Sequence, residues 1–169
     1  MNQFLTNQFV ENVQRLALGL EPIDSERRGR IAHPIKVTFN TAALGFPRRS
    51  VLRHDSCLYT LLYEPGTTDR VDLRFVDSAR RFVPRFLRVP ILTAAVAESR
   101  LYTHRVRRPM LFPGAAYDIS ATVTGLRGRV VRAVPNKEVI VRWARVEARL
   151  PHSGVLVGRA HGDDRGEFL

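Results

Sequence analysis

A histidine, two adjacent aspartates and a glutamate lie within seven residues near the end of the chain. His161, Asp163, Asp164 and Glu167 belong to residues 158–169, whose sequence is GRAHGDDRGEFL. Imidazole and carboxylate groups can bind a cation or transfer protons, so this spacing offers a metal or acid–base site. However, adjacent aspartates point in different directions in most backbones, and three ligands do not close a metal cage. The interspersed glycines are typical of turns, and we therefore expect a turn between two strands.

The remaining histidines and the single cysteine form no recognisable catalytic motif. His54, Asp55 and Ser56 are the residue types of a catalytic triad, but triad members meet in space and are rarely neighbours in sequence. No histidine pair has the spacing of a zinc motif, and no glycine-rich phosphate loop is present. Cys57 precedes a strand-like run, and we interpret it as a small core residue rather than a nucleophile. We expect a protein that is not an enzyme and uses no cofactor or metal.

Arginine carries almost all of the positive charge. The net charge is +11, and Lys36 and Lys137 are the only lysines. Guanidinium groups beside aromatic rings can bind phosphates and stack on bases, or pair with the carboxylates of a protein partner. They can also cover a solvated sheet face. We favour an acidic protein surface as the partner and keep nucleic acid as the alternative. The candidates are Arg80, Arg81, Arg85 and Arg88, which interleave with Phe82 and Phe86, and a second cluster of Arg105, Arg107 and Arg108.

Length and composition indicate an ordinary globular protein. The 169 residues suit one domain or two small ones, and 44% of them are apolar, which is enough for a hydrophobic core. No apolar run approaches the roughly 20 residues of a membrane-spanning helix. The start of the chain has neither the basic leader nor the long apolar centre of a signal peptide. We expect a cytoplasmic protein, or a component of a particle assembled in the cytoplasm.

Residues 2–20 are predicted to form an amphipathic helix. Apolar residues recur at steps of three or four, and Gly19 and Pro22 end the pattern. Such a helix must bury its apolar face either against the domain or against a partner, and both alternatives remain open. The face consists of Leu5, Phe9, Val13, Leu16 and Leu20, and the first four are candidate partner-binding residues.

Alternation of apolar and polar residues predicts strands in the first half of the chain. These strands cover residues 35–40, 58–63 and 71–76, and we expect Pro65 to Arg70 to form a hairpin loop between the second and the third. Residues 80–90 contain two prolines, which exclude a central strand, so an extended edge segment is predicted there. Its expected apolar anchors are Phe82, Phe86 and Val89.

The second half of the chain shows the same alternation. Strands are predicted at residues 101–106 and 119–124, whereas residues 93–98 fit either a short helix or a loop. In residues 138–150 apolar and polar residues alternate, but the alternation shifts by one position at Ala144–Arg145. This shift predicts a β-bulge or a bend there. The expected fold is mainly β, with one or more antiparallel β-sandwiches and an N-terminal amphipathic helix. The expected parts are the helix and connector (residues 1–30), a β lobe (31–98) and a second β lobe (99–169).

Three stretches of the C-terminal lobe resemble a known family. They are GLRGRVV (125–131), VRWARVE (141–147) and RAHGDDRGEFL (159–169), and they are laid out like the carboxypeptidase regulatory-like domain, a small β-sandwich of the transthyretin or prealbumin type. Asp163, Gly166 and Phe168 match its Asp-x-x-Gly-x-Phe motif. The resemblance implies a sandwich over about residues 119–169, a hairpin turn at the acidic stretch, and a structural or interaction module.

The chain departs from this family pattern at its end, because it stops at Leu169, three residues into the strand that Glu167 begins. We therefore expect an open sheet edge, and open edges recruit partners. Either the sequence is a fragment or an assembly completes the domain, and both alternatives remain open. Residues 77–85 (DSARRFVPR) and 107–114 (RRPMLFPG) further resemble components of phage-tail-like contractile injection particles.

Three hypotheses about function follow from these patterns. The preferred one is a non-enzymatic structural module that contacts neighbouring subunits or further copies of this chain in a larger assembly. The alternative is a basic nucleic-acid-binding protein, which the net charge of +11 motivates. The third, a hydrolase or metal enzyme using His161, Asp163 and Asp164, requires these residues to line a cleft. We expect no membrane span.

Overall fold

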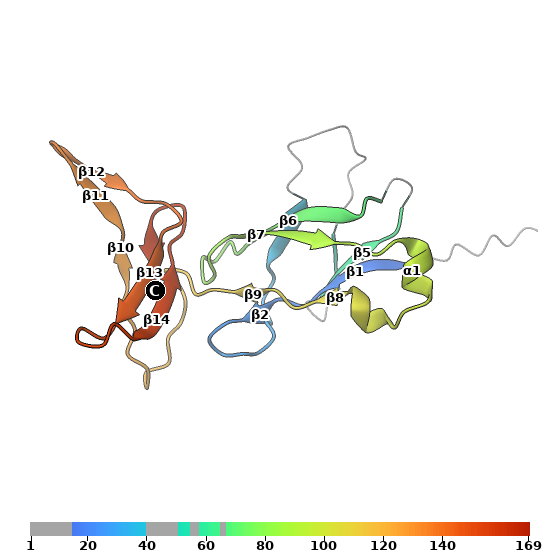
Figure 1. Ribbon diagram of the computed structural model, residues 1–169, viewed down its shortest axis with the longest axis horizontal. Coiled ribbons are helices and arrows are strands. Elements are labelled where there is room, and N and C mark those ends of the chain that lie inside the picture. Colours follow the sequence, from blue (N-terminus) through green and yellow to red (C-terminus); the bar gives the residue numbers. More distant parts are fainter. Residues whose placement is uncertain (1–14, 40–50, 55–57, 65–66) are drawn as a thin grey trace, which may run out of the picture.

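The computed structural model describes residues 15–39, 51–54, 58–64 and 67–169 (Figure 1). These residues form a mainly β protein with several separate sheets and two short helices, which confirms the predicted fold class at this level. Within the described ranges the sheets do not close into a barrel. Most strand pairs are antiparallel, but two short pairs are parallel. In this part of the chain, no helix is long and apolar enough to cross a membrane.

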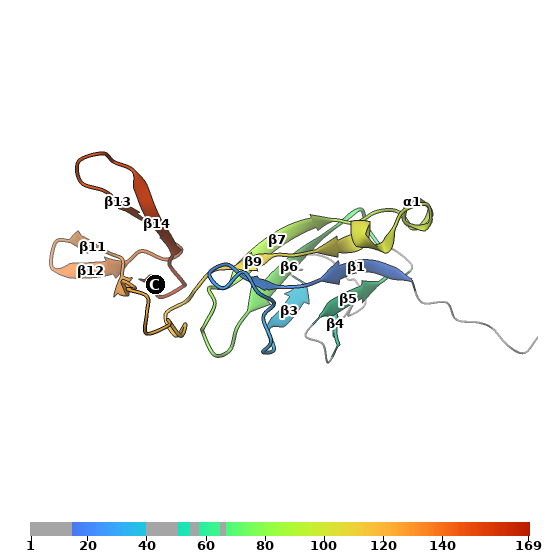
Figure 2. The same cartoon turned by 90° about the horizontal axis from the view of Figure 1, so that it is seen from below.

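Two sheets form the larger part of the molecule (Figures 1 and 2). Their buried residues belong to one hydrophobic cluster, which takes residues from Ala17 to Tyr117 and thus from all three predicted parts of the chain. The four-stranded sheet has the order β4 (Leu52–Arg53), β5 (Tyr59–Leu62), β1 (Leu16–Leu20), β8 (Val106–Arg107), and the three-stranded sheet has the order β3 (Lys36–Phe39), β6 (Arg70–Val76), β7 (Arg85–Pro90).

Leu16–Leu20 is a strand, so the predicted helix over residues 2–20 is wrong at its C-terminal end. Residues 2–14 lie outside the described part of the chain. Ala17, Leu18 and Leu20 are each 1% exposed. A strand that lies between β5 and β8 and is covered on both faces needs such a continuous apolar run. A short apolar run fits a helix and a buried strand equally well, which is why the spacing of the leucines misled the prediction.

The three strands predicted in the first half of the chain are confirmed as β3, β5 and β6. In β6, Val71, Leu73 and Phe75 are buried, as the alternation predicted. The hairpin expected at Pro65 to Arg70 is wrong, because β5 pairs with β1 and β4 whereas β6 pairs with β3 and β7. The turn residues correctly indicate that the strand ends, but they do not tell which strands pair afterwards.

Strand β7 lies at the edge of the three-stranded sheet, as the two prolines of residues 80–90 predicted. Phe82 and Val89 are buried anchors, but Phe86 is 51% exposed and is not one. Phe86 faces outward opposite Arg74, whose guanidinium group lies 5.5 Å from the centre of the Phe86 ring. The outer face of this sheet therefore uses an arginine to cover an aromatic ring.

Short elements connect the larger sheets. Residues Ala94–Glu98 form α1, which Thr93 caps, so the open question about residues 93–98 is resolved as a helix. The strand predicted at 101–106 is largely wrong, because Tyr102–Arg105 form the 3₁₀ helix η1. Leu101 and Tyr102 are 72% and 66% exposed, so the alternation there did not mark a buried face. Farther along, β2 (Ile23–Asp24) pairs in parallel with β9 (Met110–Leu111).

Three two-stranded sheets form the C-terminal part of the structure. The first joins β10 (Gly128–Arg129) to β15 (Glu167–Phe168), the second β11 (Val131–Val134) to β12 (Lys137–Ile140), and the third β13 (Arg145–Arg149) to β14 (Leu156–His161). The second and third are hairpins, named the C-terminal hairpins below, and they extend away from the larger sheets (Figures 1 and 2). The strand predicted at residues 119–124 is wrong, because these residues form a loop.

The shift in alternation near Ala144–Arg145 coincides with a complete break between two strands. Residues Val141 to Ala144 separate β12 from β13, and Trp143 has a φ of 59°, in the left-handed region. The two strands then pair with different partners. Of the two predicted alternatives, the β-bulge is therefore wrong at this position and a bend fits better, because β12 ends at Ile140 and β13 begins at Arg145. A register shift occurs instead between Ala148 and Arg149.

Candidate functional site

The acidic stretch forms a turn, as the sequence predicted. Asp163 is 5% exposed, and its Oδ1 accepts hydrogen bonds from the backbone amides of Arg165 (2.8 Å) and Glu167 (3.0 Å). Gly166 has a φ of 70°, a conformation that glycine adopts without steric cost. The turn leads from β14 to β15, which pair with β13 and β10 respectively. It therefore links two sheets and is not the expected hairpin.

Arg80 binds both carboxylates of this turn. Its Nη2 donates to Asp163 Oδ2 at 2.9 Å and to Glu167 Oε2 at 2.7 Å. Burial alone would raise the pKa of Asp163, but the hydrogen bonds from Arg80 and from two backbone amides outweigh burial and lower that pKa. Hydrogen bonds from Arg80 and Arg129 lower the pKa of Glu167. Both carboxylates are thus ionised at neutral pH and bound by guanidinium, which suits a structural role better than proton donation.

His161 and His54, the histidines of the two candidate sites, are not part of any group of three or more metal-binding side chains in the described residues. The ring of His161 lies 4.3 Å from that of Phe112, and burial, followed by the charges of nearby arginines, lowers the pKa of His161. Asp164 is exposed. Among the described residues, no three His, Cys, Asp or Glu side chains are grouped to hold a metal ion. His54 is exposed, while residues 55–57, including the cysteine, lie outside the described part.

The first arginine cluster is engaged within the chain. Besides Arg80, Arg88 makes a bidentate pair with Asp72, with distances of 2.7 Å and 3.0 Å. Arg85 donates to a backbone carbonyl of β9. Arg81 Nε lies 3.9 Å from a buried carboxylate four residues earlier in the chain. The hydrogen bonds of Arg80, Arg85 and Arg88 hold the edge segment against the rest of the fold, and the role of all four arginines in partner binding stays a prediction.

The second arginine cluster is also bonded internally. Arg105 donates to the carbonyl of Leu16 at 3.0 Å, which ties η1 to β1. Arg107 donates to two nearby backbone carbonyls. Arg108 donates to Glu21 Oε2 at 2.7 Å. Leu16, a candidate for the apolar helix face, is half-buried in β1, and the other candidates on that face, Leu5, Phe9 and Val13, lie outside the described residues.

The C-terminal hairpins and their neighbouring loop expose many large apolar side chains. In residues 155–157, three apolar residues in succession are exposed, so both faces of the strand are apolar there. In the described chain no further sheet packs on this two-stranded sheet to cover these residues. The sequence analysis did not identify this surface, although three consecutive apolar residues, Val155 to Val157, indicate a segment with apolar side chains on both faces. The exposed residues are Val123, Leu126, Val131, Ile140, Trp143, Leu150, Val155, Leu156 and Val157.

A groove of about 570 Å³, named the apolar groove below, lies along the hairpin of β13 and β14. Residues 117–120 and 123–126 form one wall, and Phe168 and Leu169 contribute to the lining. On the hairpin, Val146 lies opposite Ala160 and Ala148 lies opposite Gly158. The small side chains at these positions leave room above the sheet.

The opposite face of the same hairpin is charged. Glu147 accepts hydrogen bonds from Arg149 at 2.7 Å and Arg145 at 2.5 Å, and Arg159 lies 3.4 Å away. The hydrogen bonds from Arg149 and Arg145 lower the pKa of Glu147 to about 2. Three guanidinium groups share this single carboxylate, so the face retains positive charge.

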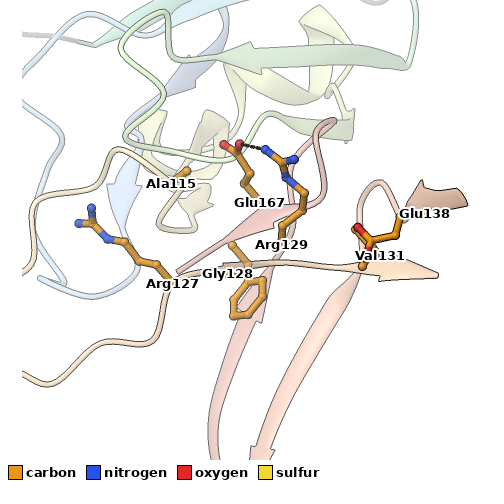
Figure 3. A pocket seen from close by; sticks show the side chains of 8 residues that line it. Ala115, Arg127, Gly128, Arg129, Val131, Glu138 and Glu167 are labelled. Atoms are coloured by element: carbon orange, nitrogen blue, oxygen red, sulfur yellow. Dashed lines mark hydrogen bonds and ion pairs between the residues drawn. The ribbon is translucent and has the colours of Figure 1, made fainter. Parts of the chain in front are cut away.

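A second pocket, of about 510 Å³, lies at the base of the other hairpin (Figure 3). Val131 and Glu138 line it from the hairpin, and Arg129 contacts Glu167 at 3.1 Å within it. Because Arg80 also binds Glu167, that carboxylate is already shared by two guanidinium groups. This pocket could therefore accommodate a ligand against its apolar wall, but it presents no reactive group.

Comparison with family models, with curated proteins and with solved structures gives no match for this chain, so the functional argument depends on the geometry described above.

Proposed function

We propose that this chain is a non-enzymatic assembly module that binds another protein through its C-terminal hairpins. The observation that carries the proposal is the distribution of apolar residues. Of the fifteen exposed large apolar residues in the described chain, nine lie in residues 119–169, whereas every buried apolar residue lies between Ala17 and Tyr117. Concentrated apolar surface on strands with open edges is typical of protein-binding sites.

Strands β10 and β15 pair with each other, and each belongs to one of the stretches that carry the sequence resemblance. Gly128 lies opposite Phe168, and a β-carbon at position 128 would be 2.9 Å from the Phe168 ring. The glycine strand and the Asp-x-x-Gly-x-Phe stretch are therefore neighbours. In the described chain these residues form three two-stranded sheets without a buried apolar core, so a transthyretin-type sandwich module in a cytoplasmic assembly, like the phage-tail-like particle, is proposed from the sequence resemblance alone.

Nucleic acid is the second candidate partner, because the net charge of +11 favours it. We place it second because both predicted arginine clusters make hydrogen bonds within the chain. A guanidinium group that already binds a carboxylate neutralises less phosphate charge than a free one does.

Affinity capture from the native source, followed by light scattering, tests the proposal. We expect a large protein complex that survives both high salt and nuclease. Phosphate contacts weaken steeply with salt, so a complex that dissolves under either treatment would reject the protein partner in favour of nucleic acid.

A matched pair of variants locates the binding surface. Val131 on β11 and Val96 on α1 are 39% and 40% exposed, so the same substitution perturbs both sites similarly in the free protein. We expect Val131→Glu to reduce capture of the partner at least about tenfold, because it places a charge in an apolar interface, and Val96→Glu to leave capture unchanged. Equal effects of the two substitutions would contradict the assignment to the C-terminal hairpins.

A further inference from the structure

We propose that the apolar groove and the open edge of β14 bind an extended segment of a partner protein in which apolar and acidic residues alternate. This inference rests on the proposed function and deepens it, because it names the kind of segment that the module recognises. The argument combines the lining of the groove, a glycine at its centre and the charge on the two faces of the hairpin.

The lining residues place the groove beside β14. From β13, only the alternate residues Val146 and Ala148 line it, whereas β14 contributes the four consecutive residues 157–160. Consecutive residues of a strand point to opposite faces. Because Gly158 has no side chain and Ala160 only a methyl group, the backbone of residues 157–160 is accessible and lines the groove beside the side chains. Among the described strands, β14 pairs with β13 alone, so its other edge is open to a further strand.

Gly158 lies in the middle of this part of β14. A β-carbon at position 158 would meet only the Ala148 methyl group within 4 Å, at an ordinary contact distance of 3.7 Å. The free protein therefore has room for a side chain that it does not carry. Glycine within a strand often marks a place where another backbone approaches closely. A segment lying against β14 would use this space.

A segment paired with β14 would place its side chains alternately on the two faces of the hairpin. On one face they would enter the apolar groove, above the small side chains of Ala148 and Ala160 and beside Leu126. This face selects large apolar residues. On the other face they would lie next to Arg159 and the arginines that share Glu147, and this face selects acidic residues.

Charge also argues against a second copy of this chain as the occupant. Each copy carries a net charge of +11 and the same arginine-rich face, so two copies would repel each other at this edge. The acidic residues Glu26 and Asp118 also line the groove, but Arg27 and Arg159 line it too. Arg27 lies 3.9 Å from the carboxylate of Asp118, so the acidic pair does not reverse this preference. An acidic partner segment is therefore the occupant that fits.

Peptides of about eight residues, the length of an ordinary strand, test the pattern directly. The probe is a labelled peptide that alternates valine and glutamate, and its controls alternate valine and lysine or carry the same residues in two blocks. We expect the alternating acidic peptide to bind to the intact chain at least about tenfold more tightly than either control, and to protect the backbone amides of residues 155–160 from hydrogen exchange. Equal binding of the three peptides, or no binding at about 1 mM, would overturn the proposal.

Substitutions in the groove give a second, independent test. Gly158→Val fills the space above Ala148 and should weaken binding of the acidic peptide at least about tenfold while the protein stays folded. Leu126 in the groove and Leu101 in the loop before η1 are 73% and 72% exposed, so Leu126→Ser should weaken peptide binding and Leu101→Ser should not. If Gly158→Val fails to fold, the leucine pair alone decides, and equal effects at the two leucines would reject the groove.

The outcomes separate this inference from the proposed function. Loss of the captured complex on nuclease treatment would remove the proposed function itself. A nuclease-resistant complex that depends on Val131 but not on Gly158 or Leu126, with no peptide selectivity, would reject the groove and leave the assembly role intact.

Discussion

Replacing Arg80 by methionine should weaken the junction between the larger sheets and the C-terminal part. Methionine keeps most of the apolar stem but removes the hydrogen bonds to Asp163 (2.9 Å) and Glu167 (2.7 Å). The Asp163 side chain is 6% exposed, so its carboxylate would stay buried without its guanidinium partner. Removing one member of a fully buried pair costs about 3–5 kcal/mol. Because the Arg80 side chain is 38% exposed and solvent screens part of the interaction, we expect a loss of about 2 kcal/mol.

Urea unfolding measures this loss in free energy, and the thermal midpoint should fall by about 4–8 °C for a chain of this size. Arg88→Met is the matched control. Arg88 also makes two hydrogen bonds to a carboxylate, that of Asp72, but its side chain is 68% exposed. We therefore expect no measurable change in stability from the control.

A double-mutant cycle with Asp163→Asn decides whether the charge pair is the cause. Asparagine removes the negative charge, while its side-chain oxygen can still accept the two backbone hydrogen bonds of the turn. Arg80→Met should cost clearly less in the Asp163→Asn background than alone. If the two losses add within about 0.5 kcal/mol, Arg80 and Asp163 do not stabilise the junction together, and the reasoning is refuted.

The same pair predicts how stability depends on pH. The folded-state pKa values of Asp163 and Glu167 lie below the ordinary values of 3.8 and 4.5. A carboxyl group with a lowered pKa stabilises the fold above its unfolded pKa, and this stabilisation disappears as the pH falls through the folded pKa. The parent chain should therefore lose stability below about pH 4.5, and Arg80→Met should lose less over the same window. Parallel pH profiles for the two proteins would contradict this explanation.

Two further substitutions test packing in the described fold. Tyr117→Phe removes the hydrogen bond of 2.6 Å from the hydroxyl group to the buried carboxylate of Asp24, and should lower the free energy of unfolding by about 2 kcal/mol in urea titrations; an unchanged midpoint would mean that water replaces the hydroxyl. Gly114→Ala places a β-carbon 2.7 Å from the carbonyl oxygen of Arg80, so we expect the free energy of unfolding to fall by about 1–3 kcal/mol. Gly158→Ala makes only an ordinary contact of 3.7 Å and should leave the stability nearly unchanged. Equal thermal midpoints for the two alanine variants would contradict the close approach at Gly114.

The sequence predicts single strands well where one face is buried. In β6, the alternation of Val71, Leu73 and Phe75 with polar residues correctly identifies the side that enters the core. It fails for Leu16–Leu20, because a strand buried on both faces has no alternation to detect. It also fails at Phe86, whose neighbour in space, Arg74, is twelve residues away in sequence. These errors share one cause, since the covering residues come from elsewhere in the chain.

The candidate site was less predictable than the fold. The glycine and aspartate pattern correctly predicts a turn at Asp163, because an aspartate that accepts hydrogen bonds from following backbone amides is a local feature. The pairing of Asp163 with Arg80 spans 83 positions and has no local signal. The arginine clusters are predicted from their charge and, for the first cluster, from the aromatic residues beside it, yet their hydrogen bonds within the fold depend on carboxylates and carbonyls that only the tertiary structure brings close.

The C-terminal part of the described structure has arginine–carboxylate pairs but no buried apolar residues. Beyond Tyr117 the described chain has no buried apolar residue, and its strands pair only in twos. Two guanidinium groups share the carboxylate of Glu167 and three share that of Glu147. Ion pairs of this exposed kind contribute little net stability. The C-terminal hairpins should therefore be the least stable part of the described fold and the part that gains most when a partner covers them. A ligand that binds only the folded state stabilises it by about 2.7 kcal/mol at a hundredfold excess over Kd, so partner binding and ordering of the hairpins should be coupled. Repulsion between the same arginines on two copies would prevent their open edges from pairing, whereas an acidic segment would be attracted. This is one physical reason for a strongly basic protein whose proposed partner is another protein.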